Sequence, residues 1–170
     1  MSQTNITKNR ETKELIMDRE FNAPIAAVWD AWANPEKLAK WWGPRGWETT
    51  IKEFTLEPGG VWHYAMKCVD ENQGEWFGQE SWGKAEFVNV DEPNSFTYKD
   101  MFSDADGNIN PDMPVMTITV SFTEQNGKTH VTSRGVFENA EEYDKVIAMG
   151  VEQGAAETWD RLAEFVETAK

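Results

Sequence analysis

The sequence has 170 residues, a length typical of one domain with a single hydrophobic core. Thirty acidic residues against sixteen basic ones give a net charge of −14, which repels phosphate backbones and anionic lipids and makes nucleic acid and membrane surfaces poor candidate partners. Cys68 is the only cysteine, which rules out an internal disulfide and a metal site built on paired thiolates.

The first 13 residues are polar, and we expect them to form a disordered leader ahead of a single domain over residues 14–170. They contain no apolar core of the kind that a signal peptide needs. No later apolar run reaches the length that spans a membrane. The sequence therefore predicts a cytoplasmic protein without membrane insertion.

Nine tryptophans are the strongest feature of the composition. Each tryptophan ring can bury about 150–250 Å² of surface. The composition therefore predicts an aromatic interior that is either filled or lined by these rings.

Residues 14–21 alternate as a strand does, with Arg19 as a charge in an otherwise apolar face. Two short helices are predicted to follow, because tryptophans recur at helical spacing over the next twenty residues. Pro24 fits the first turn of one helix, and Asn34-Pro35 ends it and can start the second.

From Trp47 to about Phe137 the apolar period is two residues, which predicts about six further strands. Their expected ranges are 47–56, 61–68, 79–90, 96–102, 116–123 and 128–137. In the second of these, Tyr64 and Cys68 share an inward face and His63 points to the solvent side. The polar segment 103–114 is predicted to be a loop.

Asn139 and Glu142 resemble a capping box that opens a helical region ending near Thr168. Gly150 and Gly154 lie one turn apart inside it and predict a kink or a close backbone approach. The order of elements predicts an α+β fold in which this helix packs against a curved antiparallel sheet of about six to seven strands.

Five short motifs occur in an order and at spacings that resemble a known family. They are Phe21-Asn22-Ala23-Pro24, Val28-Trp29-Asp30-Ala31-Trp32, Trp41-Trp42-Gly43-Pro44, Pro58-Gly59-Gly60-Val61-Trp62 and Trp159-Asp160-Arg161-Leu162. Together they are similar to homologues of the heat-shock protein 90 ATPase activator, within the START-like (SRPBCC) superfamily, over residues 14–168. The resemblance implies a helix-grip fold whose sheet and long helix enclose a cavity. The superfamily uses that space for lipids, sterols, plant hormones and polyketides.

The residues expected to line such a cavity are mostly aromatic and methionine side chains. They are Trp42, Trp62, Tyr64, Met66, Glu80, Trp82, Met116, Met149 and Trp159. Trp42 is expected at the cavity mouth. Arg19 and Glu80 are a possible polar anchor, because two charges that both face inward would pair. The alternative is an outward Glu80 and an Arg19 at the edge.

No catalytic constellation is visible in the sequence. His63 and His130 are the only histidine bases available to a nucleophile, and we interpret both as structural. Residues 104–112 alternate acidic and amide side chains as a calcium loop does, but Gly107 occupies position four of such a loop instead of six, and Val115 stands where the terminal glutamate belongs. We expect neither a metal nor a cofactor.

Three functions remain open at this point. The first is non-catalytic binding of a hydrophobic or amphipathic small molecule. The second is a co-chaperone or stress-related role, in which the acidic surface contacts a chaperone or another protein. The third is a cyclase- or hydrolase-type enzyme that uses Glu80 or Tyr64 as an acid-base group.

Overall fold

A computed structural model describes residues 4–43 and 45–168 of the chain. Its strands are β1 (Asn5–Asn9), β2 (Glu14–Phe21), β3 (Trp47–Phe54), β4 (Val61–Cys68), β5 (Glu80–Asp91), β6 (Ser95–Ser103), β7 (Met116–Gln125) and β8 (Lys128–Phe137). Its α-helices are α1 (Ile25–Ala33), α2 (Pro35–Trp41), α3 (Ala140–Ala148) and α4 (Val151–Thr168), and the 3₁₀ helix η1 spans Glu71–Trp76. None of these helices is long and apolar enough to cross a membrane.

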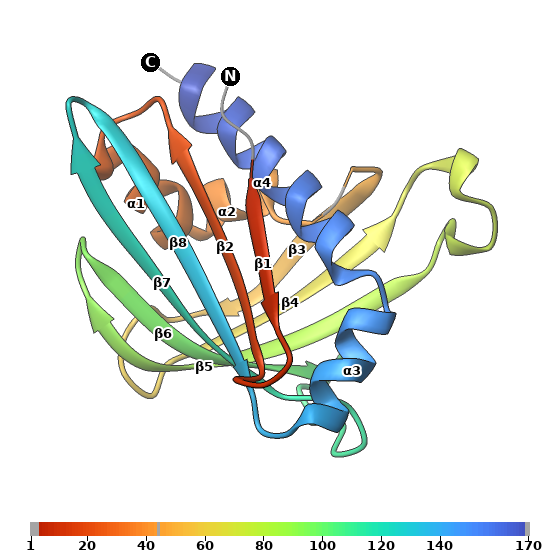
Figure 1. Cartoon of the computed structure of the whole chain (residues 1–170). Coiled ribbons are helices and arrows are strands. Elements are labelled where there is room, and N and C mark those ends of the chain that lie inside the picture. The colour runs from red at the N-terminus through yellow and green to blue at the C-terminus, as the bar shows by residue number, and fades with distance from the viewer. Residues whose placement is uncertain (1–3, 44, 169–170) are drawn as a thin grey trace.

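The eight strands form one antiparallel sheet in the order β1-β2-β8-β7-β6-β5-β4-β3. Figure 1 shows the sheet curving around one side, with α4 laid across the open side and the hairpin between β4 and β5 reaching outward. Helix α4 contacts α1, α2, α3 and β2. This is the predicted helix-grip arrangement, with two short helices after β2 and the long helix at the C-terminal end.

Aromatic rings fill the space between the short helices and the sheet. Trp29, Trp32 and Trp41 are all buried. Trp32 meets Trp41 edge to face at 4.7 Å between centroids, and Trp29 meets Phe122 of β7 at 5.3 Å. The indole nitrogen of Trp41 donates to the carbonyl of Ala31 at 2.9 Å, so even the polar edge of this fully buried ring is satisfied.

Local signals in the sequence explain how the elements begin and end. The side chain of Asn34 accepts a hydrogen bond from the backbone of Glu36 and caps α2, and Asn139 caps α3 in the same way. Asn126 and Gly127 both have positive φ, as a type I′ turn requires. Gly150, at φ 75°, divides the predicted C-terminal helical region into α3 and α4, which is the predicted kink.

The disordered leader predicted for residues 1–13 is wrong in part, because β1 lies inside it and pairs with β2. Its residues are mostly exposed, and Ile6 alone packs against the core, so β1 lacks the apolar alternation of the other strands. Lys8 pairs with Glu152 at 3.0 Å, and Arg10 makes two bonds to Asp144, at 2.9 and 3.0 Å. The strand therefore bridges β2 to both C-terminal helices, and residues 1–3 lie outside the described part.

Candidate functional site: a cavity between the sheet and the long helix

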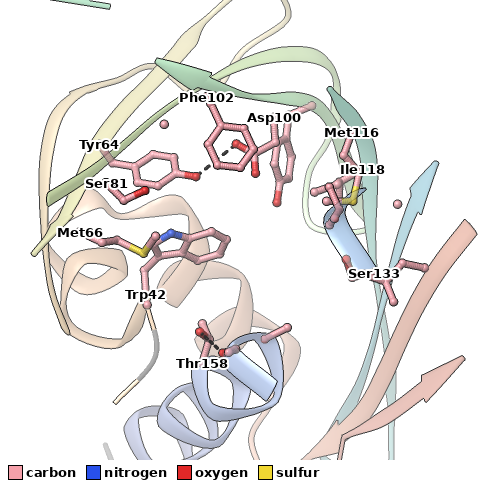
Figure 2. A pocket seen from close by; sticks show the side chains of 18 of the residues that line it. Trp42, Tyr64, Met66, Ser81, Asp100, Phe102, Met116, Ile118, Ser133 and Thr158 are labelled. Carbon is pink, nitrogen blue, oxygen red and sulfur yellow. Dashed lines mark hydrogen bonds between the residues drawn. The ribbon is translucent and has the colours of Figure 1, made fainter. Parts of the chain in front are cut away.

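A cavity of about 330 Å³ lies between the concave face of the sheet and α4. Aromatic and aliphatic side chains make up most of its wall, with Trp42 on one side and Met116 and Ile118 on the other, as Figure 2 shows. Five of the chain's seven methionines border it, namely Met17, Met66, Met101, Met116 and Met149. Methionine side chains are flexible and adapt to irregular shapes, so this wall can fit itself to an apolar guest.

Two glycines give the cavity its width. A Cβ atom at Gly83 of β5 would lie 2.6 Å from the ring of Tyr64, and one at Gly135 of β8 would lie 2.5 Å from the sulfur of Met116. Both contacts are closer than packed atoms allow. Glycine at these positions therefore lets the neighbouring side chains lie flat against the sheet and leaves the space above them open.

Asp100 is the one ionisable carboxylate among the residues that line the cavity. It stands on β6 opposite Ala85 of β5, so it points to the concave face. The hydroxyl of Tyr64 donates to one of its oxygens at 3.2 Å, and Figure 2 shows this bond beside the ring of Phe102. No Lys, Arg or His belongs to the lining as the structure describes it.

The apolar surroundings change the acidity of these groups. Burial raises the pKa of Asp100 from 3.8 to about 6, and the hydrogen bond from Tyr64 opposes that rise. Burial, and then the charge of Asp100, raise the pKa of Tyr64 and of Tyr98 well above 10. Both phenols are therefore protonated at neutral pH, whereas Asp100 is mainly ionised.

Comparison with known proteins identifies the family of this chain. Residues 22–167 match the family described as "Activator of Hsp90 ATPase homolog 1-like protein". The chain belongs to this family. No curated protein matches the chain.

Solved structures of similar proteins cover nearly the whole chain. Protein Ms6760 from Mycobacterium smegmatis is 34% identical, with a TM-score of 0.86 over 99% of this chain and 98% of its own. A protein from Staphylococcus epidermidis is 31% identical, with a TM-score of 0.80 over 98% and 95%. A protein from Arthrobacter aurescens is 27% identical, with a TM-score of 0.87 over 98% and 93%. The family fold is thus shared along the full described length.

The last of the five motifs, in α4, has a clear structural role in this family member. Arg161 donates to the carbonyls of Lys40 and Gly43, both at 2.9 Å, and so satisfies carbonyls at the C-terminal end of α2. Asp160 accepts from Arg19 of β2 at 2.6 Å. These bonds fix α4 against α2 and β2 and so set the width of the cavity.

The structure brings most of the predicted lining residues together. Those that border the cavity are Trp42, Tyr64, Met66, Trp82, Met116, Met149 and Trp159. Trp42 follows the last residue of α2, although Pro44 of its motif lies outside the described residues. Met149 is 55% exposed, which places it at the rim between α3 and α4.

Two tryptophans differ from the expectation. Trp62 is inward but fully buried and does not line the cavity, because Trp42 and Tyr64 cover it at 4.7 and 4.8 Å between centroids. Trp82 borders the cavity, but its ring packs against His63 at 5.0 Å between centroids, with the ammonium group of Lys52 over it, on the outer face of the sheet. The inward row of β5 is made by its neighbours Ser81 and Gly83 instead.

The expected polar anchor of Arg19 and Glu80 is not formed. Glu80 pairs in register with Lys67 on the outer face, where it is exposed, and it lies outside the cavity. Arg19 is inward and 3% exposed, but its partner is Asp160, and it does not border the cavity either. The carboxylate in the cavity is Asp100.

His63 lies on the outer face as predicted but is not solvent-exposed. A loop after β6 covers it, and His63 donates through Nε2 to the carbonyl of Asp104 at 3.0 Å. The carboxylate of Asp104 in turn accepts from the backbones of Asp106 and Asn108 at 2.9 Å, so local bonds occupy the segment that resembles a calcium loop. No group of three potential metal ligands occurs among the described residues.

Several lining residues were missing from the sequence-based set, and Asp100 is the most important. Its strand alternates Phe96, Tyr98, Asp100 and Phe102, so strand parity alone would have placed an acid in an inward aromatic row. The others are Leu15, Met17, Trp32, Gly43, Ser81, Gly83, Tyr98, Met101, Phe102, Pro114, Ile118, Ser133, Gly135, Val146, Gly154, Ala155 and Thr158.

Proposed function

We propose that this protein binds a hydrophobic or amphipathic small molecule in the cavity between the sheet and α4. The observation that carries the proposal is the cavity itself, at about 330 Å³ with a wall of aromatic rings and five methionines. Ligand sites typically enclose about 300–1,000 Å³, are mainly apolar and hold few polar groups. The fold, which commonly holds hydrophobic ligands, supports the same conclusion.

A cavity-filling substitution tests the proposal. Ala155 of α4 borders the cavity, whereas its neighbour Ala156 does not, so Ala155→Leu and Ala156→Leu form a matched pair on one helix. A screen of fatty acids, sterols and polycyclic aromatics by tryptophan fluorescence, with native mass spectrometry of the purified protein, identifies the ligands to compare.

We expect Ala155→Leu to weaken binding of any such ligand by about tenfold or more, because the added methylenes occupy its space. Ala156→Leu should leave binding within about threefold. The proposal would be wrong if no compound in the screen shifted the fluorescence, or if the two variants weakened binding equally.

A co-chaperone role is the second candidate, because the family description names an Hsp90 ATPase activator and the chain carries a charge of −14. The assay is Hsp90 ATPase turnover with increasing amounts of this protein. Stimulation that persists in Ala155→Leu would support a surface role that is independent of the cavity. Unchanged turnover at high concentration would count against it.

The two acid-base groups that the sequence suggested for an enzyme, Glu80 and Tyr64, are poorly suited to that role. Glu80 and His63 lie on the outer face of the sheet and cannot reach a molecule in the cavity. Tyr64 borders the cavity, but its raised pKa makes it a hydrogen-bond donor at neutral pH rather than a base.

A further inference from the structure

Asp100 is the one charged side chain in the described cavity wall, and its second oxygen accepts no hydrogen bond from a described residue. Asp100 accepts one hydrogen bond, at 3.2 Å from Tyr64, which is long for a bond between two oxygens. It forms no ion pair with any described residue. An ionised carboxylate normally accepts several hydrogen bonds or pairs with a cation when it is withdrawn from water.

Aromatic residues surround this carboxylate. Tyr64 and Tyr98 lie close enough for the charge of Asp100 to raise the pKa of both phenols. Trp42 meets Tyr64 at 6.0 Å between centroids, and Phe102 stands next to Asp100 in the inward row of β6. Aromatic faces attract cations and do not attract anions.

We infer that the ligand carries a protonated amine at one end of an apolar body, and that the ammonium group binds Asp100 within the rings of Tyr64, Tyr98 and Trp42. This inference rests on the proposed small-molecule function and specifies its ligand class. The ammonium would donate to the free oxygen of Asp100, and the rest of the molecule would lie against Met116, Ile118 and α4.

Charge argues against the other common class of amphipathic ligand. A carboxylate or phosphate head would enter a cavity whose described lining holds no cation and already holds one anion. The net charge of −14 also lowers the local concentration of anions and raises that of cations. Fatty acids are therefore poor candidates, although they are of suitable shape.

Three probes with the same ring system separate these possibilities. They are naphthylethylamine, which is a cation at neutral pH, naphthylethanol, which is neutral, and naphthylacetate, which is an anion. Binding is measured by titration calorimetry and by the indole signals of the nine tryptophans in nuclear magnetic resonance spectra. We expect the amine to bind about tenfold or more tightly than the alcohol, and the anion to bind most weakly.

Asp100→Asn removes the charge while keeping the shape and an acceptor for Tyr64. It should weaken binding of the amine by about tenfold to a hundredfold and leave the affinity for the alcohol within about threefold of wild type. Glu80→Gln is the matched control, because it changes the net charge equally from an exposed position outside the cavity. It should leave both affinities unchanged.

Acidification provides a test in the unaltered protein. The titratable groups that face Asp100 are Tyr64 of β4 and Tyr98 of its own strand, and the lining residues of β5, β7 and α4 add none. Because the carboxylate is protonated below about pH 6, amine affinity should fall about tenfold between about pH 8 and pH 5. Affinity for the alcohol should stay constant.

The outcomes distinguish this inference from the proposed function. Equal affinity for all three probes, preference for the anion, or equal weakening of amine and alcohol in Asp100→Asn would overturn the amine inference and leave cavity binding intact. Failure of every probe to bind, without change in the indole signals, would count against both.

Discussion

The charge of Asp100 should make the protein less stable at neutral pH, so Asp100→Asn is expected to stabilise it. A pKa raised from 3.8 to about 6 means that the fold binds the proton more tightly than the unfolded chain does. Stability from this group is therefore greatest at low pH and falls as pH rises through about 6. Above that, ionised Asp100 costs roughly 3 kcal/mol.

Asparagine removes the cost of the ionised carboxylate. The hydrogens of its side-chain amide would have no hydrogen-bond partner, which offsets about 1 kcal/mol of the gain in stability. We expect Asp100→Asn to raise the free energy of unfolding by about 1–3 kcal/mol at about pH 8. The gain should shrink to well under 1 kcal/mol at about pH 4, where Asp100 is protonated in the folded protein and about half protonated in the unfolded chain.

Urea unfolding of wild type, Asp100→Asn and Glu80→Gln at both pH values measures this. Hydrogen bonds lower the pKa of Glu14, Asp104 and Asp144, so all three proteins lose stability in acid, and the diagnostic quantity is the difference from wild type at each pH. A difference for Asp100→Asn that is independent of pH, or a loss of stability at about pH 8, would refute the reasoning. Glu80→Gln should stay within about 0.5 kcal/mol of wild type.

Two further substitutions test how the walls of the cavity are held. Gly83→Ala places a methyl group 2.6 Å from the ring of Tyr64, so it should lower the free energy of unfolding by about 1–3 kcal/mol and shift the Tyr64 ring signals in nuclear magnetic resonance spectra. Asp160→Asn weakens the partner of Arg19, whose side chain is 2% exposed, and should cost about 1–3 kcal/mol in urea unfolding. Unfolding curves identical to wild type would contradict both.

Periodicity was sufficient to predict the architecture. The apolar residues of β3 to β8 recur at a period near two along the sequence, and asparagine caps and positive-φ glycines identify several turns and helix ends. Strand β1 was missed for a physical reason. It lies at the sheet edge with little buried surface, and ion pairs such as Arg10 with Asp144 hold it to distant segments that a local pattern cannot reveal.

The cavity wall was harder to predict than the fold. In β5 the inward face carries Ser81, Gly83 and Ala85, whereas the outer face carries Trp82. Size alone favours the tryptophan row as the interior one. The small residues are inward because the ring of Tyr64 from the next strand occupies the space that larger side chains would need.

The sequence also did not predict how deeply each ring lies in the cavity wall. Parity correctly places Trp62 and Tyr64 on the same face, but it does not say which ring lies above the other. The curvature of the sheet and the position of Trp42 at the end of α2 decide that Trp62 is covered. Such contacts depend on how elements pack, which no single strand encodes.

Asp100 links the stability of the protein to its proposed ligand. A cost of roughly 3 kcal/mol is a large share of the about 5–15 kcal/mol that stabilises a typical domain. A neutral side chain at this place in β6 would avoid that cost, and strongly perturbed ionisable groups in cavities are typical of functional sites. Stability and amine affinity should therefore change in opposite directions. Asp100→Asn should raise the free energy of unfolding and lower the affinity for the amine. Substitution of an acid with a purely structural role would not change these two quantities in opposite directions.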